Sequence, residues 1–538
     1  MVNRGRPSRD CRPCRKRKLR CDLQRDKCGQ CRRANIACFG WPDPRALIIR
    51  DETASARQKV LSRHSNCNAL PTSLSPSWQV RARHAFFAYY VFGFSRSHDA
   101  LAQLYAAASV DSVLSAAVDA AALAFMVKHH QAPGSVIETR SAPVRPTALG
   151  RLATESYTAS IRRLSSIMNA AMQPTSAAGA TGSGVEQLHD DATLQAVLLL
   201  DLYEKLAHVG SRPGRAPRPH DTISSSDHPG DGPWMSHLRG ALDLVRARGP
   251  HRRYSSPTAR RLTARLAMTV VISCAVAGVH VPAELQELRM GLLPYLGTPS
   301  LSEDRVTKVW NADWVDPKFA ATGLVIGVVN LAADVSLGTT TASEVVRLAT
   351  KLDGQLVEME RGLPPPWQSE RKYTSTDSKI VYAGYYDTYT DHFVAQVRNV
   401  IRSMRLLLAD LACKHCLPCW DPADDPCGTS VSALVRDLCC DICASVPQFV
   451  WPEARSDNRI PFTPLQTLQC YTLLSPLYLA GKLSPQLGMR TWVIAILKYM
   501  ADCGGMRAAK TVADILLYAP QVSYWQIYAM LGSYAFAA

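Results

Sequence analysis

The chain has 538 residues, enough to bury a large core. Its longest apolar run, about Met268 to Val279, is shorter than the ~20 residues that a membrane-spanning helix needs, so we expect no membrane association. The formal net charge is +16. Residues 1–50 hold 15 Lys and Arg against 4 Asp and Glu, a net of +11, whereas the other 488 residues hold 46 against 41. The positive charge therefore belongs to the N-terminal segment, which favours an acidic partner such as nucleic acid.

Six cysteines near the N-terminus follow the spacing C-x2-C-x6-C-x6-C-x2-C-x6-C. They are Cys11, Cys14, Cys21, Cys28, Cys31 and Cys38. Two tetrahedral zinc ions need eight ligand positions, so six thiolates suffice if two of them bridge both metals. Each C-x2-C pair supplies a tight turn, and each x6 stretch that follows has room for a short helix. The spacing therefore predicts two half-copies of one unit that together hold two Zn²⁺.

The alternative for six cysteines is a disulfide framework. No apolar signal segment stands before them in the sequence, so we expect a reducing compartment in which disulfides are rare. C-x2-C spacing is also typical of metal sites. Zinc binding is therefore the favoured interpretation.

A basic run lies between the second and third cysteines, with one more cation just before it. Its members are Arg12, Arg15, Lys16, Arg17, Lys18 and Arg20. Charges this dense do not form a packing element. On a short helix fixed to a metal core, they would reach phosphates and the acceptor edge of guanine in the major groove of double-stranded DNA. A solvated charge run or a nuclear-localisation signal alone is less favoured, because neither explains the flanking cysteines.

Residues 11–38 resemble the fungal binuclear zinc cluster, the Zn2Cys6 DNA-binding domain. The stretch from Cys14 to Asp22 matches the signature C-R-x-R-K-x-[KR]-C-D of that family at each fixed position. The resemblance implies that Cys11 and Cys28 bridge the two zinc ions.

The same resemblance implies a mode of DNA recognition. Lys18 would contact bases with Arg17 beside it, and the other basic side chains would hold phosphates. Modules of this family read short CGG-like half-sites, and dimer geometry sets the spacing between them. The implied protein is a nuclear regulator of RNA polymerase II transcription.

The chain departs from the family pattern in one loop. Many members carry proline two residues before the fourth cysteine, whereas this chain has Asp26 there. We therefore expect the loop from Asp22 to Lys27 to be less rigid, although the ligands should supply most of the folding free energy.

Upstream of the cysteines, the sequence Arg4-Gly5-Arg6-Pro7 has the form of an arm that binds the minor groove. Because the motif is only four residues long, a flexible basic tail that adds salt-dependent affinity is favoured over a minor-groove contact by Arg4 and Arg6.

The sequence predicts three regions: the DNA-binding domain at 1–45, a polar linker at 46–76, and a large domain at 77–538. The linker shows no sustained heptad pattern, so a coiled-coil dimer is not indicated. A monomer and a homodimer formed by the large domain both stay open.

The large domain has helical periodicity and few alternating strand patterns, so we expect it to be all-α. We expect the N-terminal domain that precedes it to be a small zinc-stabilised unit of two short helices and loops. The predicted helices include 191–209, 234–248, 260–279, 342–361, 391–413 and 490–500. Three stretches rich in Ala, Ser, Pro and Gly, at 131–150, 173–184 and 211–232, favour mobile loops.

Short stretches of this domain resemble the fungal-specific transcription factor domain that commonly follows a zinc cluster. They are Leu200 to Glu204, His237 to Gly249, Ile442 to Pro447 and Leu474 to Tyr478. The resemblance implies a regulatory role: inhibition, dimerisation or contact with a coactivator or corepressor, under control of a small effector. No residue is assigned to an effector site.

A second cysteine group lies at Cys413, Cys416, Cys419 and Cys427, followed by Cys439, Cys440 and Cys443. Metal binding and redox sensing are open, but ordinary burial is favoured, because the last three lie on an apolar helical face. Two aromatic runs, 86–90 and 382–389, favour helical core packing over base stacking.

The sequence carries no H-E-x-x-H, G-x-S-x-G, P-loop or dinucleotide motif, so we expect no enzyme. A pathway-specific regulator of a biosynthetic gene cluster for a secondary metabolite is one interpretation. The alternative is a DNA-bound repressor or a scaffold that recruits a partner, since no acidic-hydrophobic activation segment stands out.

Overall fold

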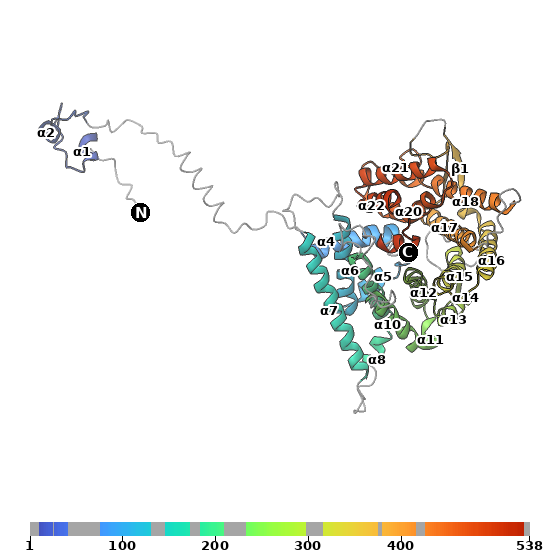
Figure 1. Cartoon of the computed structure of the whole chain (residues 1–538). Coiled ribbons are helices and arrows are strands. Elements are labelled where there is room, and N and C mark those ends of the chain that lie inside the picture. Colours follow the sequence, from blue (N-terminus) through green and yellow to red (C-terminus); the bar gives the residue numbers. More distant parts are fainter. Residues whose placement is uncertain are drawn as a thin grey trace, which may run out of the picture. The chain divides into compact units, whose positions relative to one another are not determined.

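The structure is a computed structural model of the whole chain. It describes residues 10–24, 26–40, 76–130, 146–172, 183–208, 233–296, 316–374, 379–415 and 426–531. The chain divides into two compact units, Met1–Ser75 and Pro76–Ala538 (Figure 1). The arm at Arg4 and Arg6, and the predicted linker except for its last residue, lie outside the described residues.

The first unit contains two five-residue helices, α1 (Arg12–Lys16) and α2 (Gly29–Arg33). Each begins directly after a cysteine that serves as its N-cap, Cys11 for α1 and Cys28 for α2. The cysteines that we expect to bind metal therefore also set where the helices start.

The second unit is largely helical. Its first part contains α4 (Trp78–Ala85), the π-helix η1 (Phe86–Phe94), α5 (Leu101–Ala107), α6 (Val113–His130), α7 (Pro146–Met172), α8 (Ser183–Leu188) and α9 (Asp191–His208). The middle part contains α10 (Pro233–Ala247), α11 (Gly249–Arg253), α12 (Pro257–Ala277), α13 (Ala283–Met290), α14 (Leu293–Leu296), α15 (Pro317–Leu337) and α16 (Ala342–Arg361).

The last part begins with the 3₁₀-helix η2 (Pro365–Trp367) and the strands β1 (Glu370–Tyr373) and β2 (Tyr385–Thr388). The helices that follow are α17 (His392–His415), α18 (Pro426–Ala444), α19 (Pro447–Val450), α20 (Pro464–Leu483), α21 (Leu487–Gly504), α22 (Arg507–Tyr518) and α23 (Tyr524–Met530). The six helices named from the sequence are all present, and their ends lie within four residues of the predicted ones.

The ends of the long helices follow from local chemistry. In α12, the Ser256 hydroxyl accepts a hydrogen bond from the N–H of Ala259 at 3.0 Å, and Gly278 ends the helix in the left-handed conformation. In α15, the Asp316 carboxylate caps the first turn and Gly338 ends the helix in the same way. The polar cap accepts a hydrogen bond from an N–H group of the first turn, and glycine adopts the left-handed conformation that ends a helix without strain.

Helix α20 is the centre of the C-terminal part. It packs against η1, α17, α18, α19, α21, α22 and α23, and Figure 1 shows it beneath α21 and beside α22. Its residues Leu473, Leu474, Leu477 and Tyr478 are fully buried. Helix α20 is therefore apolar nearly all round, as expected for a central element.

The second unit is not entirely helical, because β1 and β2 form an antiparallel hairpin. Arg371 on β1 lies opposite Asp387 on β2, and their side chains form an ion pair at 2.8 Å. The aromatic run 382–389 lies in this hairpin, so the prediction that it packs as a helix is wrong. Ala383 and Gly384 have positive φ, which ends any helix there, and the aromatic and β-branched residues of 385–388 then favour a strand. The other run, 86–90, is helical and packs into the core as expected.

The most apolar long helix is α15, not the stretch around 268–279. The helix has 21 residues and contains an 18-residue window with a mean hydropathy of 1.7, so by length and composition it is apolar enough to cross a membrane, although a buried helix passes the same test. Glycine, threonine and asparagine are spread along it, so the sequence shows no long uninterrupted apolar run there. In the structure, α15 packs against α12, α16 and α17, and Val328, Val329 and Leu331 belong to the core.

The three stretches expected to be mobile loops lie mostly outside the described residues. Their edges are helical where they are described: 146–150 begins α7, and 183–184 begins α8. The predicted stretches are therefore too long at these two ends.

The N-terminus of α20 generates a stability prediction. The Thr463 hydroxyl accepts a hydrogen bond from the N–H of Gln466 at 3.1 Å, and the Gln466 side chain accepts from the N–H of Thr463 at 3.4 Å. We expect Thr463→Ala to destabilise this domain by about 1 kcal/mol, measured from the urea midpoint of its helical signal. Thr463→Ser retains the hydroxyl and should unfold near the wild-type midpoint; equal midpoints for all three chains would show that the cap contributes nothing.

Candidate metal centre and nucleic-acid interface

The N-terminal unit consists of two backbone copies that are offset by 17 residues. Cys11 has φ −60° and ψ 150°, and Cys28 has φ −67° and ψ 146°. The N–H of Arg15 bonds the carbonyl of Cys11 at 3.0 Å, and the N–H of Arg32 bonds that of Cys28 at 3.0 Å. The repeat expected from the cysteine spacing is therefore present as repeated local geometry.

The two copies also end alike. The N–H of Leu19 bonds the carbonyl of Cys14 at 2.9 Å, and the N–H of Ile36 bonds that of Cys31 at 3.1 Å. The residue before each donor is left-handed, with φ 56° at Lys18 and φ 50° at Asn35. Asparagine adopts this conformation readily, whereas for lysine it costs roughly 1–2 kcal/mol. The metal-held turn therefore fixes Lys18 in a conformation that its residue type disfavours.

The cysteine sulfurs form two sets of four. One set is Cys11, Cys14, Cys21 and Cys28; the other is Cys11, Cys28, Cys31 and Cys38. Within each set the sulfurs lie within 4.8 Å of one another. The two sets share Cys11 and Cys28, the pair for which the family resemblance implies bridging.

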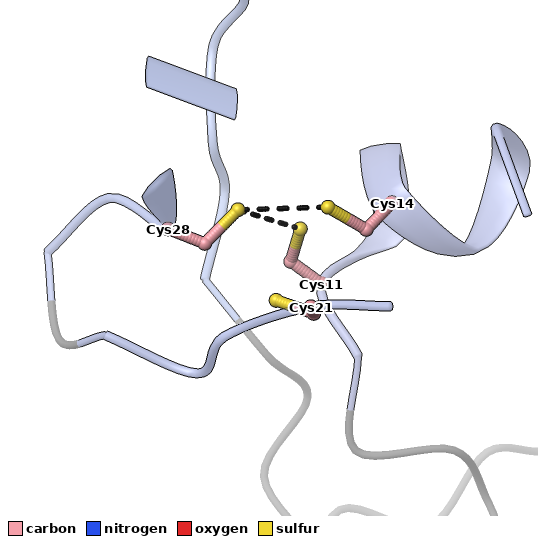
Figure 2. A group of neighbouring side chains, drawn as sticks. All are labelled: Cys11, Cys14, Cys21 and Cys28. Atoms are coloured by element: carbon pink, nitrogen blue, oxygen red, sulfur yellow. Dashed lines mark hydrogen bonds between the residues drawn. The ribbon is translucent and has the colours of Figure 1, made fainter. Parts of the chain in front are cut away.

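The spacing of the sulfurs fits zinc. The Cys28 sulfur lies 3.5 Å from that of Cys14 and 3.6 Å from that of Cys11, and Figure 2 shows these side chains pointing toward one another. A Zn–S bond of about 2.3 Å places the corners of a tetrahedron roughly 3.8 Å apart. Each set can therefore surround one ion without a change in the backbone.

The protonation of the cluster also favours a metal. Burial raises the pKa of the Cys31 thiol to about 12. Burial acts to raise the pKa of Cys28 as well, but the N–H of Cys31, which bonds its sulfur at 3.4 Å, and the neighbouring thiols lower it to about 6. Thiolates held this close together repel one another, and two Zn²⁺ would supply the positive charge that offsets the repulsion.

The predicted DNA-contacting residues are all on the surface of the first copy. Arg12, Arg15, Lys16, Arg17, Lys18 and Arg20 are exposed. Their side chains form no hydrogen bond or ion pair with any part of the chain that the structure describes. They are therefore available to an anionic partner.

The second copy differs in its cations. Arg32 donates to the Gln24 side chain at 3.2 Å, and Arg33 donates to the carbonyl of Gly29 at 3.4 Å. Positions 34, 35 and 37, which correspond to Arg17, Lys18 and Arg20, are uncharged. Most of the module's cations that have no hydrogen-bond or ion-pair partner in the described chain therefore lie in the first copy, and Lys27 is a further exposed one just before Cys28.

Residues 9–46 match the family model of the fungal Zn(2)-Cys(6) binuclear cluster domain. The N-terminal module is thus a zinc cluster of the fungal Zn2Cys6 type. It binds two Zn²⁺, and such a domain is the DNA-binding domain of a transcription factor, which is not an enzymatic role. A nuclear protein is implied in general. No curated protein and no solved structure matches the chain significantly.

The family match does not reach the second unit, so the resemblance of 77–538 to a fungal-specific transcription factor domain remains a prediction. The landmark stretches of that resemblance lie on α9, on α10 and α11, on α18 and α19, and on α20.

The second cysteine group shows no metal-binding geometry in the described residues, where the Zn2Cys6 module supplies both candidate metal sites. Cys439 and Cys443 are fully buried in α18, and burial raises the pKa of Cys439 to about 12, so neither is a reactive thiolate. Cys413 is exposed at the end of α17. Cys416 and Cys419 lie outside the described residues, and the side chain of Cys427 is not described.

Sequence reasoning did not assign a role to Asp22 or Gly29. The Asp22 carboxylate accepts a hydrogen bond from the N–H of Gly29 at 2.7 Å. Glycine at the first position of a helix, where side chains are normally tolerated, is the signal that could have identified a close approach.

The shared sulfurs generate a metal-binding prediction. Cys28→Ala removes one ligand from both sets, so we expect the purified chain to retain neither zinc ion, measured as zinc per chain. Cys503→Ala, which changes a half-buried cysteine of the second unit, should retain two. Retention of one or two ions by Cys28→Ala would contradict the shared position of this sulfur.

Proposed function

We propose that this protein is a nuclear, zinc-dependent regulator of RNA polymerase II transcription that binds double-stranded DNA at CGG-like half-sites. The observation that carries the proposal is the cluster of exposed, uncommitted cations on the zinc-held first copy. Six such charges within nine residues of a small module supply salt-dependent affinity for phosphates.

Base recognition is assigned to Lys18, with Arg17 beside it. Lys18 lies at the left-handed corner where α1 ends, so its side chain and the adjacent backbone are presented by a rigid turn. A lysine at such a corner can donate to the O6 and N7 atoms of guanine, which are the acceptors that a CGG triplet offers in the major groove. The remaining cations, Arg12, Arg15, Lys16 and Arg20, are assigned to phosphates.

Zinc has a structural role in this proposal. Each ion would be held by four cysteine sulfurs, which would leave no open position for a reacting group. The ions would hold α1 and α2 at a fixed geometry, and the cationic side chains of this chain would make the contacts to DNA.

The proposed organisation is a DNA-binding domain at 1–45, a linker at 46–76, and a regulatory domain of the fungal-specific transcription factor type at 77–538. The regulatory domain would dimerise or contact a coactivator or corepressor, and a small effector would control it. The proposed biological setting is a biosynthetic gene cluster for a secondary metabolite.

The second candidate is a DNA-bound repressor or a partner-recruiting scaffold. It is favoured by the sequence of the C-terminal region from Tyr518 onward, which is apolar and aromatic and not acidic. Fusion of the chain from residue 46 onward to a foreign DNA-binding domain distinguishes the two: reporter activation supports an activator, and reduced expression supports a repressor.

The proposed specificity predicts the outcome of a selection experiment. The full-length chain should enrich CGG-like triplets from a random DNA pool at a fixed salt concentration, and a zinc chelator should abolish the enrichment. The spacing of triplets in the enriched pool reports whether the chain binds as a dimer. Enrichment that persists without zinc, or none at all, would disprove sequence reading by this module.

The two kinds of contact predict different mutant behaviour. Lys18→Ala should cost roughly 1 to 3 kcal/mol on the selected sequence and relax its base preference. Arg12→Ala should weaken binding to selected and random DNA alike and lower the salt slope by about 1. Equal losses on both DNAs for both variants, in titrations at several salt concentrations, would refute this assignment of roles.

A further inference from the structure

The loop between the third and fourth cysteines joins the two copies of the module. Its first residue, Asp22, follows Cys21, and its carboxylate accepts a hydrogen bond from the N–H of Gly29 at 2.7 Å. Gly29 is the first residue of α2 and directly follows the shared ligand Cys28. The bond therefore links the residue that follows the first copy to the first residue of α2 in the second copy.

The contact depends on the absence of a side chain at position 29. A Cβ atom built on Gly29 would lie 2.4 Å from Asp22 Oδ2, far inside van der Waals contact. The backbone of α2 approaches the carboxylate this closely only because residue 29 is glycine. The two residues are thus matched to one another.

This bond acts on the helix that carries the shared sulfur. The first N–H groups of a helix lack partners within the helix, and in α2 two of them are satisfied by side chains. The N–H of Gly29 bonds Asp22, and the N–H of Cys31 bonds the sulfur of Cys28 at 3.4 Å. Loss of the Asp22 bond would leave Cys28, a ligand in both sulfur sets, on a helix start that is less constrained.

The backbone of this loop is incompatible with the proline that many members of the family carry at position 26. Asp26 has φ 69°, a conformation that proline cannot adopt because its ring fixes φ near −65°. A second side-chain bond, from Arg32 to Gln24 at 3.2 Å, fastens the same loop to α2. Side-chain bonds to α2 therefore restrain the loop where other members carry proline.

We propose that Asp22 is a positioning residue that, with Gly29, holds Cys28 in place and thereby slows the loss of zinc from the cluster. This inference rests on zinc binding by the module and is independent of the DNA sequence that the protein reads. Outer carboxylates that orient metal ligands typically contribute 10–100-fold to metal affinity.

The test measures zinc release from the purified full-length chain to a chromogenic chelator. Asp22→Ala removes the acceptor, and Gly29→Ala places a Cβ against it, so each should speed release about tenfold. The double variant should be no faster than the faster single variant, because both changes break the same bond. Asp22→Asn retains an acceptor oxygen and should restore release to within about threefold of wild type.

Asp26→Asn is the matched control, since it removes one carboxylate from the same loop at a residue whose side chain bonds nothing in the described chain. It should release zinc at the wild-type rate. Wild-type release by both Asp22→Ala and Gly29→Ala would overturn the proposal, as would equal acceleration by Asp26→Asn, which would indicate a general charge effect.

Zinc per chain is measured before each release experiment, which separates slow loading from fast loss. If Asp22→Ala binds no zinc, the comparison of Asp22→Asn, Gly29→Ala and Asp26→Asn decides: faster release by Gly29→Ala alone supports the bond, and equal rates for all three overturn it.

Replacement of zinc by Co²⁺ gives a second readout. A changed thiolate absorption spectrum in Asp22→Ala, with an unchanged one in Asp26→Asn, would show that the ligand geometry itself has moved.

Discussion

Coordination of two metal ions by shared sulfurs is the interaction on which the N-terminal module depends. Among the residues of the module that the structure describes, the buried cluster consists of five cysteines, with Cys38 packed against it, and includes no aliphatic or aromatic side chain. Leu19, Leu23, Ile36 and Phe39 are all exposed. A unit this small has too little apolar area to fold on burial alone, so metal binding and folding are one process.

The module also shows how a repeated backbone can carry a one-sided surface. Both copies place a cysteine before a short helix and a left-handed residue after it, and the hydrogen bonds repeat at nearly equal lengths. The side chains differ: the first copy carries free cations, and the second uses its two arginines within the chain. The cysteine cluster determines the backbone of both copies, whereas the side chains of each copy determine which copy is suited to DNA.

The parts of the structure that were predictable are those governed by strong, local rules. Cysteine spacing specifies a ligand set almost by itself, and the helix over 342–361 was predicted to the residue because Thr341 caps its start and an amphipathic pattern fills it. The hairpin at 370–388 was missed because its stability depends on long-range contacts, among them the ion pair of Arg371 with Asp441 on α18 at 2.9 Å. The bond between Asp22 and Gly29 was missed for a similar reason. The Asp22 carboxylate approaches the backbone of α2 across a loop, and the only sign of this contact in the sequence is the glycine at position 29.

The described part of the module is held by cysteines and not by an apolar core, which has a consequence for the cell. A domain that folds only with its metal has a folded fraction set by the free zinc concentration, in the same way that any ligand stabilises the state that binds it. The second unit has extensive apolar packing of its own. When zinc is scarce, we therefore expect the folded fraction of the N-terminal module to fall more than that of the second unit, so that the zinc supply limits how much of the protein can bind DNA.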